Sequence, residues 1–217
     1  MTQKQIFMNG EGNEYFHRNR AASENADVAK AIQFYSSYIK AGSKVLEIGC
    51  CNGANLSGLQ SLVGCECFGI DPSEEAIADG RRRFPSLWLS AGTADELPFA
   101  PGEFDFVLFG FCLYLVDREL LPRTVAEGDR VLRSGGFLGI TDFDAATPTV
   151  HRYKHASGVS TYKMDYSRLF TAYPHYSLVS KISYSHAADV FHPDPNERLA
   201  STVLFKDTEH AYAVGER

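Results

Sequence analysis

The sequence predicts a doubly wound α/β fold, in which a mostly parallel sheet carries helices on both faces. Short apolar runs alternate with amphipathic stretches between about residues 40 and 145, the runs are apolar almost throughout, and a glycine-containing turn follows the first run. Continuously apolar strands separated by helices are typical of a parallel sheet that is covered on both sides. We expect seven strands in the sheet, with an antiparallel edge near the C-terminus.

The expected parallel strands are short runs of mostly apolar residues bounded by turns. Crossovers between such strands are right-handed, which leaves few topologies. The strands are expected at KVLEIG (44–49), ECFGID (66–71), LWLSAG (87–92), FDFVLFGF (104–111) and GGFLGITDF (135–143).

The expected helices carry apolar residues at three- to four-residue spacing. Ser23 suits the N-cap of the first helix and Gly42 its end, while Pro122 is expected to interrupt the last. The helices are expected at 23–40, 55–63, 73–84 and 118–132.

The chain from residue 146 onward is rich in Tyr, His and Ser. SLVSKISYSH (177–186) and RLASTVLFKD (198–207) alternate as paired antiparallel strands do. A short helix is expected at 165–173. We expect the two strands to complete the edge of the sheet.

Composition limits the partners. The formal net charge of the 217 residues is −6, which disfavours a broad nucleic-acid-binding surface, and Arg81 to Arg83 are expected to be a solvated helix end. The start, MTQKQIFMNGEG, lacks the apolar core of a signal peptide, and no run of about 18 apolar residues suggests a membrane span. We therefore expect a cytoplasmic protein, monomeric or homodimeric, without a nucleic-acid or membrane partner.

The five cysteines do not suggest disulfides or a metal site. Their number is odd, and neither Cys50-Cys51 nor the pair Cys65 and Cys67 has the C-x-x-C spacing of a zinc site or a thioredoxin-like centre. We expect reduced thiols, with the Cys50-Cys51 pair contributing backbone geometry to its turn.

The turn after the first strand is the candidate ligand-binding loop. In an open parallel sheet, ligands bind beyond the carboxyl ends of the strands. Gly49 and Gly53 leave the backbone bare, and the helix that follows directs free N–H groups and a partial positive charge toward this place. Asp71 ends the second strand, where a carboxylate accepts hydrogen bonds from ribose hydroxyls, and Glu47 suits a cationic amino group. The loop is not a P-loop, because no lysine follows the glycines.

Four ordered segments carry a resemblance to a known family. VLEIGCCNG (45–53), GIDPSEEAI (69–77), GTADELPFAPGEFDFVLF (92–109) and LRSGGFLGITDF (132–143) resemble the successive motifs of class I S-adenosylmethionine-dependent methyltransferases. The resemblance covers about residues 40–145. It implies the Rossmann-like fold of that family and S-adenosyl-L-methionine as cofactor, with S-adenosyl-L-homocysteine as product.

The resemblance implies where the cofactor lies. Asp71 would hold the ribose and Pro72 would lie beside the adenine. Two departures from the family pattern stand out: Cys51 replaces a glycine of the loop, and Thr93 replaces the acid that usually receives the adenine amino group, with Asp95 as a second-choice partner. The further cofactor contacts expected are Glu47, Gly49, Cys50, Cys51, Asn52, Thr93, Ala94, Phe109 and Gly110.

A narrower resemblance concerns the N-terminus. GEGNEYFHRNR (10–20), with YKMDYSRLF (162–170), is similar to bacterial small-molecule and sugar-pathway methyltransferases, whose first residues fold over the cofactor. It would place Tyr15, Phe16, Arg18 or Asn19 near the methionine end. The alternative is a segment that merely covers the sheet.

Candidates for catalysis and for the acceptor pocket follow the strands. Phe109, Phe111 and Tyr114 lie at or after the end of the fourth strand. A general base would help a hydroxyl acceptor, whereas an amine or carboxylate acceptor needs only positioning. The expected catalytic residues are Tyr114, Asp142 and His17, with Asp144, His151 and His155 as further possible bases.

The tail supplies further substrate candidates. His151 and His155 are four residues apart, which on a helix could form a metal face, but no third ligand accompanies them, and we expect no metal. Lys163 could bind a carboxylate or phosphate of the substrate. The expected substrate contacts are Phe111, Tyr114, His151, Tyr162 and Lys163.

These expectations favour a methyltransferase that acts on an oxygen, nitrogen or carboxylate of a small metabolite. A nicotinamide-dependent oxidoreductase, a non-catalytic cofactor-binding relative and a peptide or protein carboxylate as acceptor stay open. The chain is expected to form one domain over residues 1–217, in which residues 1–40 cap the cofactor, 40–145 bind it, and 146–217 supply the substrate side and the sheet edge.

Overall fold

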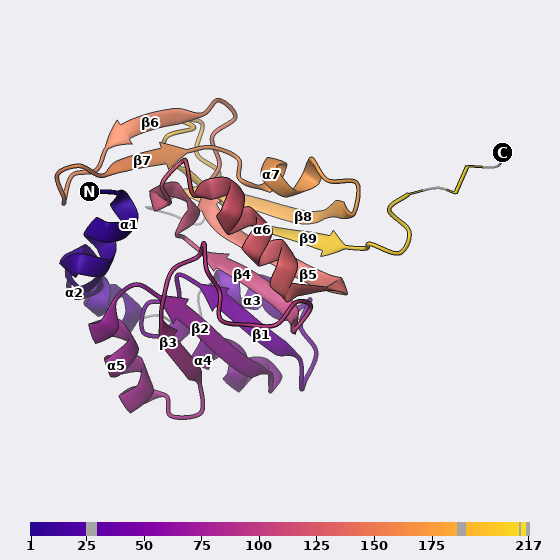
Figure 1. Cartoon of the computed structure of the whole chain (residues 1–217), viewed down its shortest axis with the longest axis horizontal. Helices are drawn as coiled ribbons and strands as arrows, with labels where there is room; N and C mark the ends of the chain where they lie inside the picture. Colours follow the sequence, from indigo (N-terminus) through magenta and orange to yellow (C-terminus); the bar gives the residue numbers. More distant parts are fainter. Residues whose placement is uncertain (25–29, 186–189, 213, 216–217) are drawn as a thin grey trace.

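The structure is a computed structural model that describes residues 1–24, 30–185, 190–212 and 214–215. Its centre is a seven-stranded sheet in the order β3-β2-β1-β4-β5-β9-β8. Helices lie on both faces of this sheet (Figure 1). The strand order reverses at β1, between β2 and β4, so the predicted doubly wound sheet is confirmed.

The parallel strands form where uninterrupted apolar runs predict them. Strands of this kind are buried on both faces, and β4 is buried along nearly all its length. The only large difference is that the last strand begins at Leu132, before the expected GGFLGITDF. The strands are β1 (Lys44–Ile48), β2 (Glu66–Asp71), β3 (Trp88–Ala91), β4 (Phe104–Gly110) and β5 (Leu132–Phe143).

The antiparallel edge is also confirmed. β9 (Arg198–Lys206) pairs with β5, and β8 (Tyr176–Ser185) pairs with β9, both antiparallel. The short helix α7 (Ser167–Thr171) precedes β8. The alternating pattern in the tail therefore predicted its place in the fold.

The helices between the parallel strands lie close to their expected positions, with one correction. α4 (Ala54–Val63) and α5 (Glu74–Arg83) follow β1 and β2, and the Ser73 hydroxyl accepts the Ala76 N–H at 3.0 Å to cap α5. α6 (Leu121–Val131) carries Pro122 in its first turn and is not interrupted by it. Proline is tolerated in the first helical turn because its missing N–H has no intrahelical partner there. A single 3₁₀ turn, η2 (Leu113–Leu115), lies between β4 and α6.

The N-terminal segment is helical, which the sequence did not predict. α1 (Gln3–Ile6), the π-helical η1 (Phe7–Glu11) and α2 (Gly12–Glu24) run in succession. Ser23 lies inside α2, so it is not the N-cap of the helix that was expected at 23–40. The expected helix at 23–40 is represented by α3 (Lys30–Ser36), and residues 25–29 lie outside the described residues.

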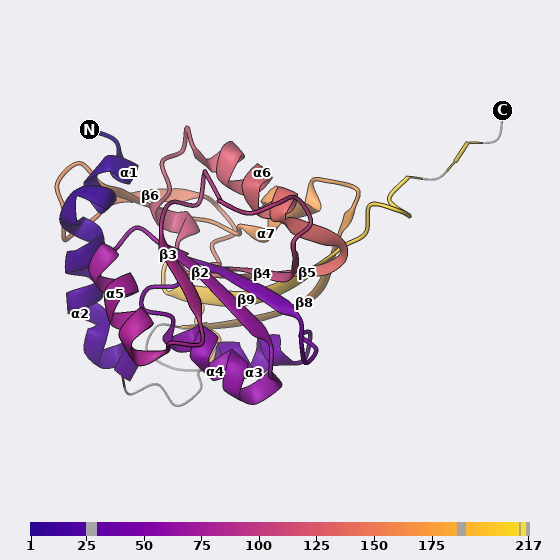
Figure 2. The ribbon, with the colours of Figure 1, turned by 60° about the horizontal axis from the view of Figure 1, so that its bottom comes forward.

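α2 lies beside α5 (Figure 2). The Ser73 hydroxyl donates to Asn13 Oδ1 at 2.8 Å, and Asn13 Nδ2 donates to Glu75 at 3.1 Å. These bonds join the N-terminal segment to the element that follows β2.

A two-stranded hairpin was likewise missed. β6 (Thr149–Arg152) pairs antiparallel with β7 (Ser160–Lys163), and the hairpin lies near α1 (Figure 1). The Ser160 N–H donates to Gln3 Oε1 at 2.7 Å. His151 lies in β6 and His155 in the turn after it, so the two histidines do not share a helix face.

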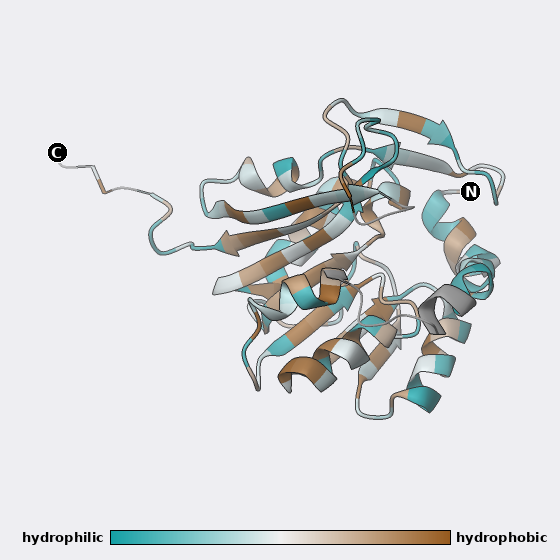
Figure 3. Ribbon diagram, turned by 180° about the vertical axis from the view of Figure 1, so that it is seen from behind, coloured by the Kyte–Doolittle hydropathy of each residue, from teal (hydrophilic) through white to brown (hydrophobic). Residues whose placement is uncertain are grey.

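The apolar core fills both sides of the sheet, and Figure 3 shows hydrophobic residues concentrated on the central strands. In the parallel register Ile48 of β1 lies opposite Ile70 of β2 and Phe109 of β4. The carboxyl ends of these three strands therefore meet at one edge of the sheet. Among the described residues, no helix combines the length and hydropathy needed to cross a bilayer.

Candidate functional site

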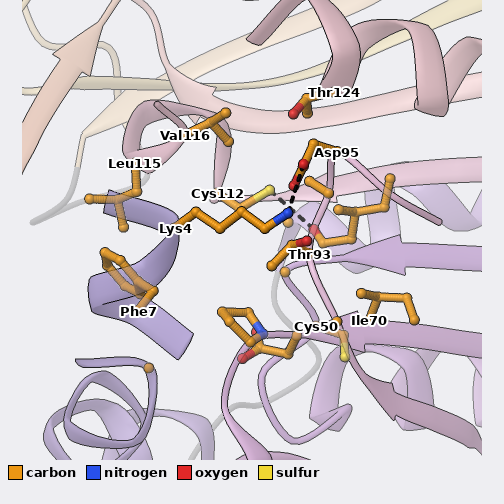
Figure 4. A pocket seen from close by; sticks show the side chains of 18 of the residues that line it. Lys4, Phe7, Cys50, Ile70, Thr93, Asp95, Cys112, Leu115, Val116 and Thr124 are labelled. Carbon is orange, nitrogen blue, oxygen red and sulfur yellow. Dashed lines mark hydrogen bonds and ion pairs between the residues drawn. The ribbon is translucent and has the colours of Figure 1, made fainter. Parts of the chain in front are cut away.

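A cavity of about 240 Å³ lies at the carboxyl ends of the parallel strands, between the sheet and the N-terminal segment (Figure 4). This is where an open α/β sheet binds ligands. The sequence-predicted residues that line it are Tyr15, Gly49, Cys50, Cys51, Asp71, Pro72, Thr93, Ala94, Asp95, Gly110 and Phe111.

The loop after β1 forms the floor of the cavity. The N–H groups of Gly49 and Cys50 both donate to the Ile70 carbonyl, at 2.8 and 3.2 Å. Gly49 has φ +80°, and a Cβ there would lie 2.7 Å from Cys112 Cβ. Glycine is therefore required at this position by both backbone angle and space.

Cys51 takes a left-handed backbone conformation, with φ 50°. This is the conformation that favours glycine, and Cys51 stands where the family pattern has one. Phe111, in the loop after β4, also has a positive φ of 56° and lines the cavity. Non-glycine residues in this region carry strain, which concentrates at ligand sites.

Asp71 ends β2 at the cavity wall. Its Oδ2 accepts the Cys51 N–H at 2.8 Å and its Oδ1 accepts the Ser73 N–H at 2.9 Å. A carboxylate has about four acceptor positions, so two stay open toward the cavity. Burial raises the pKa of Asp71 to about 6, although the two backbone hydrogen bonds act in the opposite direction.

Glu47 is a buried carboxylate behind the cavity floor, only 1% exposed. Its Oε1 accepts from Asn55 Nδ2 at 3.1 Å, while its Oε2 has no hydrogen-bond partner among the described residues. A Cβ at Gly110 would lie 2.5 Å from Oε1, so the bare backbone of Gly110 covers this acid. Burial raises the pKa of Glu47 to about 7.

The cysteines of the loop are poor nucleophiles. Burial raises the pKa of the Cys50 thiol well above its ordinary range and that of Cys51 to about 12. In the described part of the chain, no group of three or more His, Cys, Asp or Glu side chains is placed to hold a metal ion.

An aromatic cluster closes the cavity on the side of β4. Tyr15 of α2 and Tyr114 of η2 share a side-chain hydrogen bond, and burial raises the pKa of both phenols. The rings of Phe111 and Tyr114 lie 4.6 Å apart, and Phe143 packs on both. Tyr114 itself is buried behind the lining.

Asp142 is buried at the end of β5 and does not line the cavity. Its Oδ1 accepts the Phe143 N–H at 2.8 Å and its Oδ2 the Tyr114 N–H at 3.3 Å. Burial raises the pKa of Asp142 to about 7. The carboxylate thus organises the backbone of η2 beside the aromatic cluster.

Three predicted cofactor contacts point away from the cavity. Arg18 bonds to Glu11 and to the Tyr153 hydroxyl. Asn52 is buried and donates to Asp79 at 3.1 Å. Phe109 is fully buried, with its ring 5.9 Å from that of Phe170.

The remaining candidates also lie outside the lining. Exposed His17 bonds to Glu75 at 2.8 Å, and exposed His151 lies 3.2 Å from the Thr149 hydroxyl. Tyr162 stacks under the Arg118 guanidinium at 4.2 Å. Lys163 donates to the Asn196 carbonyl at 2.6 Å and lies over Phe143.

The cavity is completed by residues that the sequence analysis did not single out. Lys4 of α1 reaches across it to Asp95, with Nζ 2.8 Å from Oδ2 (Figure 4). The Asp117 carboxylate accepts the N–H groups of Gln3 and Lys4 at 2.9 and 2.8 Å and so caps α1. The pattern Thr2-x-x-Gln5, a capping box, was the available signal for this helix. The further residues added to the lining are Phe7, Gly12, Ile48, Asn55, Ile70, Gly92, Cys112, Leu115, Val116, Leu120 and Thr124.

Comparison with known proteins agrees with this architecture. A methyltransferase domain family matches residues 46–140. A demethylmenaquinone methyltransferase of Staphylococcus saprophyticus is 36% identical over 122 residues, which are 54% of this chain and 50% of the relative. An uncharacterized methyltransferase of Synechocystis sp. is 31% identical over 104 residues, 48% of this chain and 49% of the relative. The chain thus spans about half the length of these curated relatives.

Solved structures extend the similarity of fold to nearly the whole chain. The 1,6-didemethyltoxoflavin-N1-methyltransferase of Burkholderia thailandensis, solved with S-adenosylhomocysteine and 1,6-didemethyltoxoflavin, superposes with a TM-score of 0.73 at 15% identity, over 94% of this chain and 88% of that one. The [4+2]-cyclase SpnF superposes with a TM-score of 0.69 at 16% identity, over 95% and 97%. The same fold thus carries more than one chemistry.

Proposed function

This chain belongs to the class I S-adenosylmethionine-dependent methyltransferase family, and we propose that it transfers a methyl group from S-adenosyl-L-methionine to a small metabolite. The observation that carries the proposal is the cavity at the carboxyl ends of β1, β2 and β4, where a bare glycine turn faces a half-buried carboxylate. The proposed acceptor atom is an oxygen or nitrogen, including a carboxylate oxygen.

The residues present fit this cofactor. Asp71 offers two open acceptor positions to the ribose hydroxyls, beside backbone that Gly49 leaves bare. The unpartnered Glu47 Oε2 suits the ammonium of the methionine part, because a buried acid without a partner gains most from a cation. We propose that Pro72, Thr93 and Ala94 border the adenine, as their place in the lining supports.

The protein's task in this reaction is chiefly alignment and exclusion of water. The sulfonium of the cofactor supplies an already activated methyl group. Phe111 and the Tyr15–Tyr114 pair enclose the cavity on the side of β4, where we propose that the acceptor enters. These rings would hold the acceptor in line with the methyl group and the sulfur. They would also tolerate the positive charge that leaves the sulfonium as the methyl group is transferred.

General-base catalysis by the predicted acids and histidines has little support from their positions. Asp142 accepts two backbone N–H groups behind the lining, and His17 is paired with Glu75 at the surface. We propose Tyr114 as the remaining group that could contact an acceptor, through movement of Tyr15. An acceptor that needs positioning alone fits this site best.

Ligand-dependent thermal stability tests the proposal. Binding to the folded state alone raises the unfolding temperature, and a ligand at about 100 times its Kd stabilises by about 2.7 kcal/mol. S-adenosylhomocysteine is expected to raise the unfolding temperature, and NAD is expected to leave it unchanged. Stabilisation by NAD alone would favour an oxidoreductase, and no response to either would contradict the proposed cofactor.

A further inference from the structure

The chain contains two Asn-Gly pairs, Asn9-Gly10 and Asn52-Gly53, and the structure places them in opposite surroundings. The side-chain amide of an asparagine is open to attack by the backbone nitrogen of the next residue, which displaces ammonia and closes a five-membered imide. Glycine in that next position leaves the nitrogen unhindered, because it has no side chain. The two pairs therefore share one intrinsic reactivity, and the fold decides which of them can react.

Asn9-Gly10 lies in open surroundings at a kink in η1. Asn9 is exposed, and no hydrogen bond holds its side chain among the residues that the structure describes. Both residues depart from helical backbone angles, with φ −93° and ψ 17° at Asn9 and φ 137° and ψ −30° at Gly10. A Cβ at Gly10 would meet no heavy atom within 4 Å. The amide, the attacking nitrogen and water can therefore meet at this point.

Asn52-Gly53 is closed to the same reaction. Asn52 is 1% exposed, and its Nδ2 donates to Asp79 at 3.1 Å. The Gly53 N–H donates to the Cys50 carbonyl at 2.8 Å, so the nitrogen that would attack is engaged in the turn. A Cβ at Gly53 would lie 3.1 Å from the Leu89 side chain, which leaves little room for an imide ring. Reaction here requires the turn to open, and buried structure opens rarely.

The chain is fixed to the rest of the protein on both sides of Asn9. Before it, the Asp117 carboxylate caps α1. After it, the Gly12 backbone is closely packed, because a Cβ at Gly12 would lie 3.0 Å from the Phe7 carbonyl oxygen and 3.3 Å from the Ser73 nitrogen. An isoaspartate adds one methylene group to the main chain between these two fixed points. α1 has four residues and α2 has thirteen, so we expect α1 to be the helix that moves.

We propose that Asn9 is a modification site, at which attack by the Gly10 nitrogen leads to aspartate or isoaspartate, and that the isoaspartate form releases α1 from the cavity. The Gly10 nitrogen forms a bond to Asn9 Cγ, the Cγ–Nδ2 bond breaks, and the proton of the attacking nitrogen leaves with the ammonia. Water then cleaves one of the two imide C–N bonds, which leaves Gly10 joined through the main-chain carbonyl or through Cγ. Water is consumed and ammonia is released, so the modification is independent of the cofactor that the cavity binds.

Peptide mapping by mass spectrometry tests the site. The protein is incubated at pH 8.5 and 37 °C, and conversion of Asn9 and Asn52 is followed in the same sample. Asn9 is expected to convert about 100-fold faster, because Asn52 reacts only when its turn opens. The chain unfolded in urea is the matched control, in which both asparagines are expected to convert at similar rates. An intact Asn9 in the folded protein, equal rates there, or the same 100-fold difference in the unfolded chain would each overturn the proposal.

Amide hydrogen exchange tests the effect on α1. In the converted protein, exchange in residues 3–8 is expected to be about 5-fold faster than in fresh protein, because α1 no longer stays docked. Asn9→Gln is the control variant, because the longer side chain closes a ring far more slowly. After the same incubation, Asn9→Gln is expected to keep the exchange rates of fresh protein. Unchanged exchange in protein converted to isoaspartate would overturn the release of α1, and equally fast exchange in the incubated variant would show that Asn9 is not its cause.

Discussion

Replacing Asp71 by alanine is expected to weaken cofactor binding by a predictable amount. The carboxylate holds the N–H groups of Cys51 and Ser73 at 2.8 and 2.9 Å, which fixes it beside the cavity with two acceptor positions open. Hydrogen bonds to a charged group contribute about 1.5–3 kcal/mol each, but water would satisfy part of what is lost. A net loss of about 1–3 kcal/mol corresponds to a rise in Kd of roughly 5- to 150-fold.

The pH dependence of this binding identifies the group. Burial raises the pKa of Asp71 to about 6 from an ordinary value near 4, so the carboxyl becomes protonated as pH falls through about 6. The ribose hydroxyls favour the ionised form. The affinity for S-adenosylhomocysteine is therefore expected to be constant above pH 7 and to fall by up to tenfold per pH unit below 6.

Isothermal titration calorimetry with S-adenosylhomocysteine between pH 5 and pH 8 measures both effects. Asp71→Ala is expected to bind S-adenosylhomocysteine more weakly, and its affinity is expected not to decline near pH 6. Asp105→Ala is the control, because Asp105 also accepts a backbone N–H, from Lys44 at 2.8 Å, and does not line the cavity. Equal Kd values for Asp71→Ala and the unsubstituted protein would refute the ribose assignment.

Three further predictions concern the loop and the N-terminal segment. Burial raises the pKa of Glu47 to about 7, so the folded protein is most stable with this acid protonated, below about pH 4.5, and loses stability as the pH rises through 7. Glu47→Gln is therefore expected to raise the free energy of unfolding, measured by urea denaturation, by about 1–2 kcal/mol at pH 8 and by little at pH 5. A difference that does not change with pH would contradict this. Cys51 has φ 50°, so Cys51→Gly is expected to change stability by less than about 1 kcal/mol and Cys51→Val to lower it by about 2 kcal/mol; equal losses would exclude backbone strain at this position. Asp117→Ala removes the cap of α1 and is expected to speed amide hydrogen exchange in residues 3–11 by about 5- to 30-fold, which corresponds to about 1–2 kcal/mol. Unchanged exchange would show that other contacts hold α1 in place.

The sheet was predictable because its information is local. Each parallel strand is a short apolar run, and the alternation in the tail marks β8 and β9. The N-terminal helices and the β6–β7 hairpin were not predictable in the same way. Their residues are polar or aromatic without clear periodicity, and their positions depend on contacts with distant elements, such as that of Gln3 with Ser160.

The candidate site shows the same division. Topology places the loops after β1, β2 and β3 at one edge, so Gly49, Asp71 and Thr93 could be expected to line one cavity, as they do. Side-chain direction could not be predicted. Asn52 turns toward Asp79 because the tight turn fixes its orientation, and Phe109 alternates with Gly110 along β4 and so faces the core. Lys4 reaches the cavity because α1 docks on Asp117 and, through Gln3, on Ser160, contacts between residues far apart in the sequence.

A crystal structure of the protein with S-adenosylhomocysteine tests the central claim most directly. The account predicts that the ligand lies in the cavity between β2, β4 and α1, with both ribose hydroxyls within hydrogen-bonding distance of the Asp71 carboxylate. A ligand bound elsewhere, or a ribose turned away from Asp71, would contradict it.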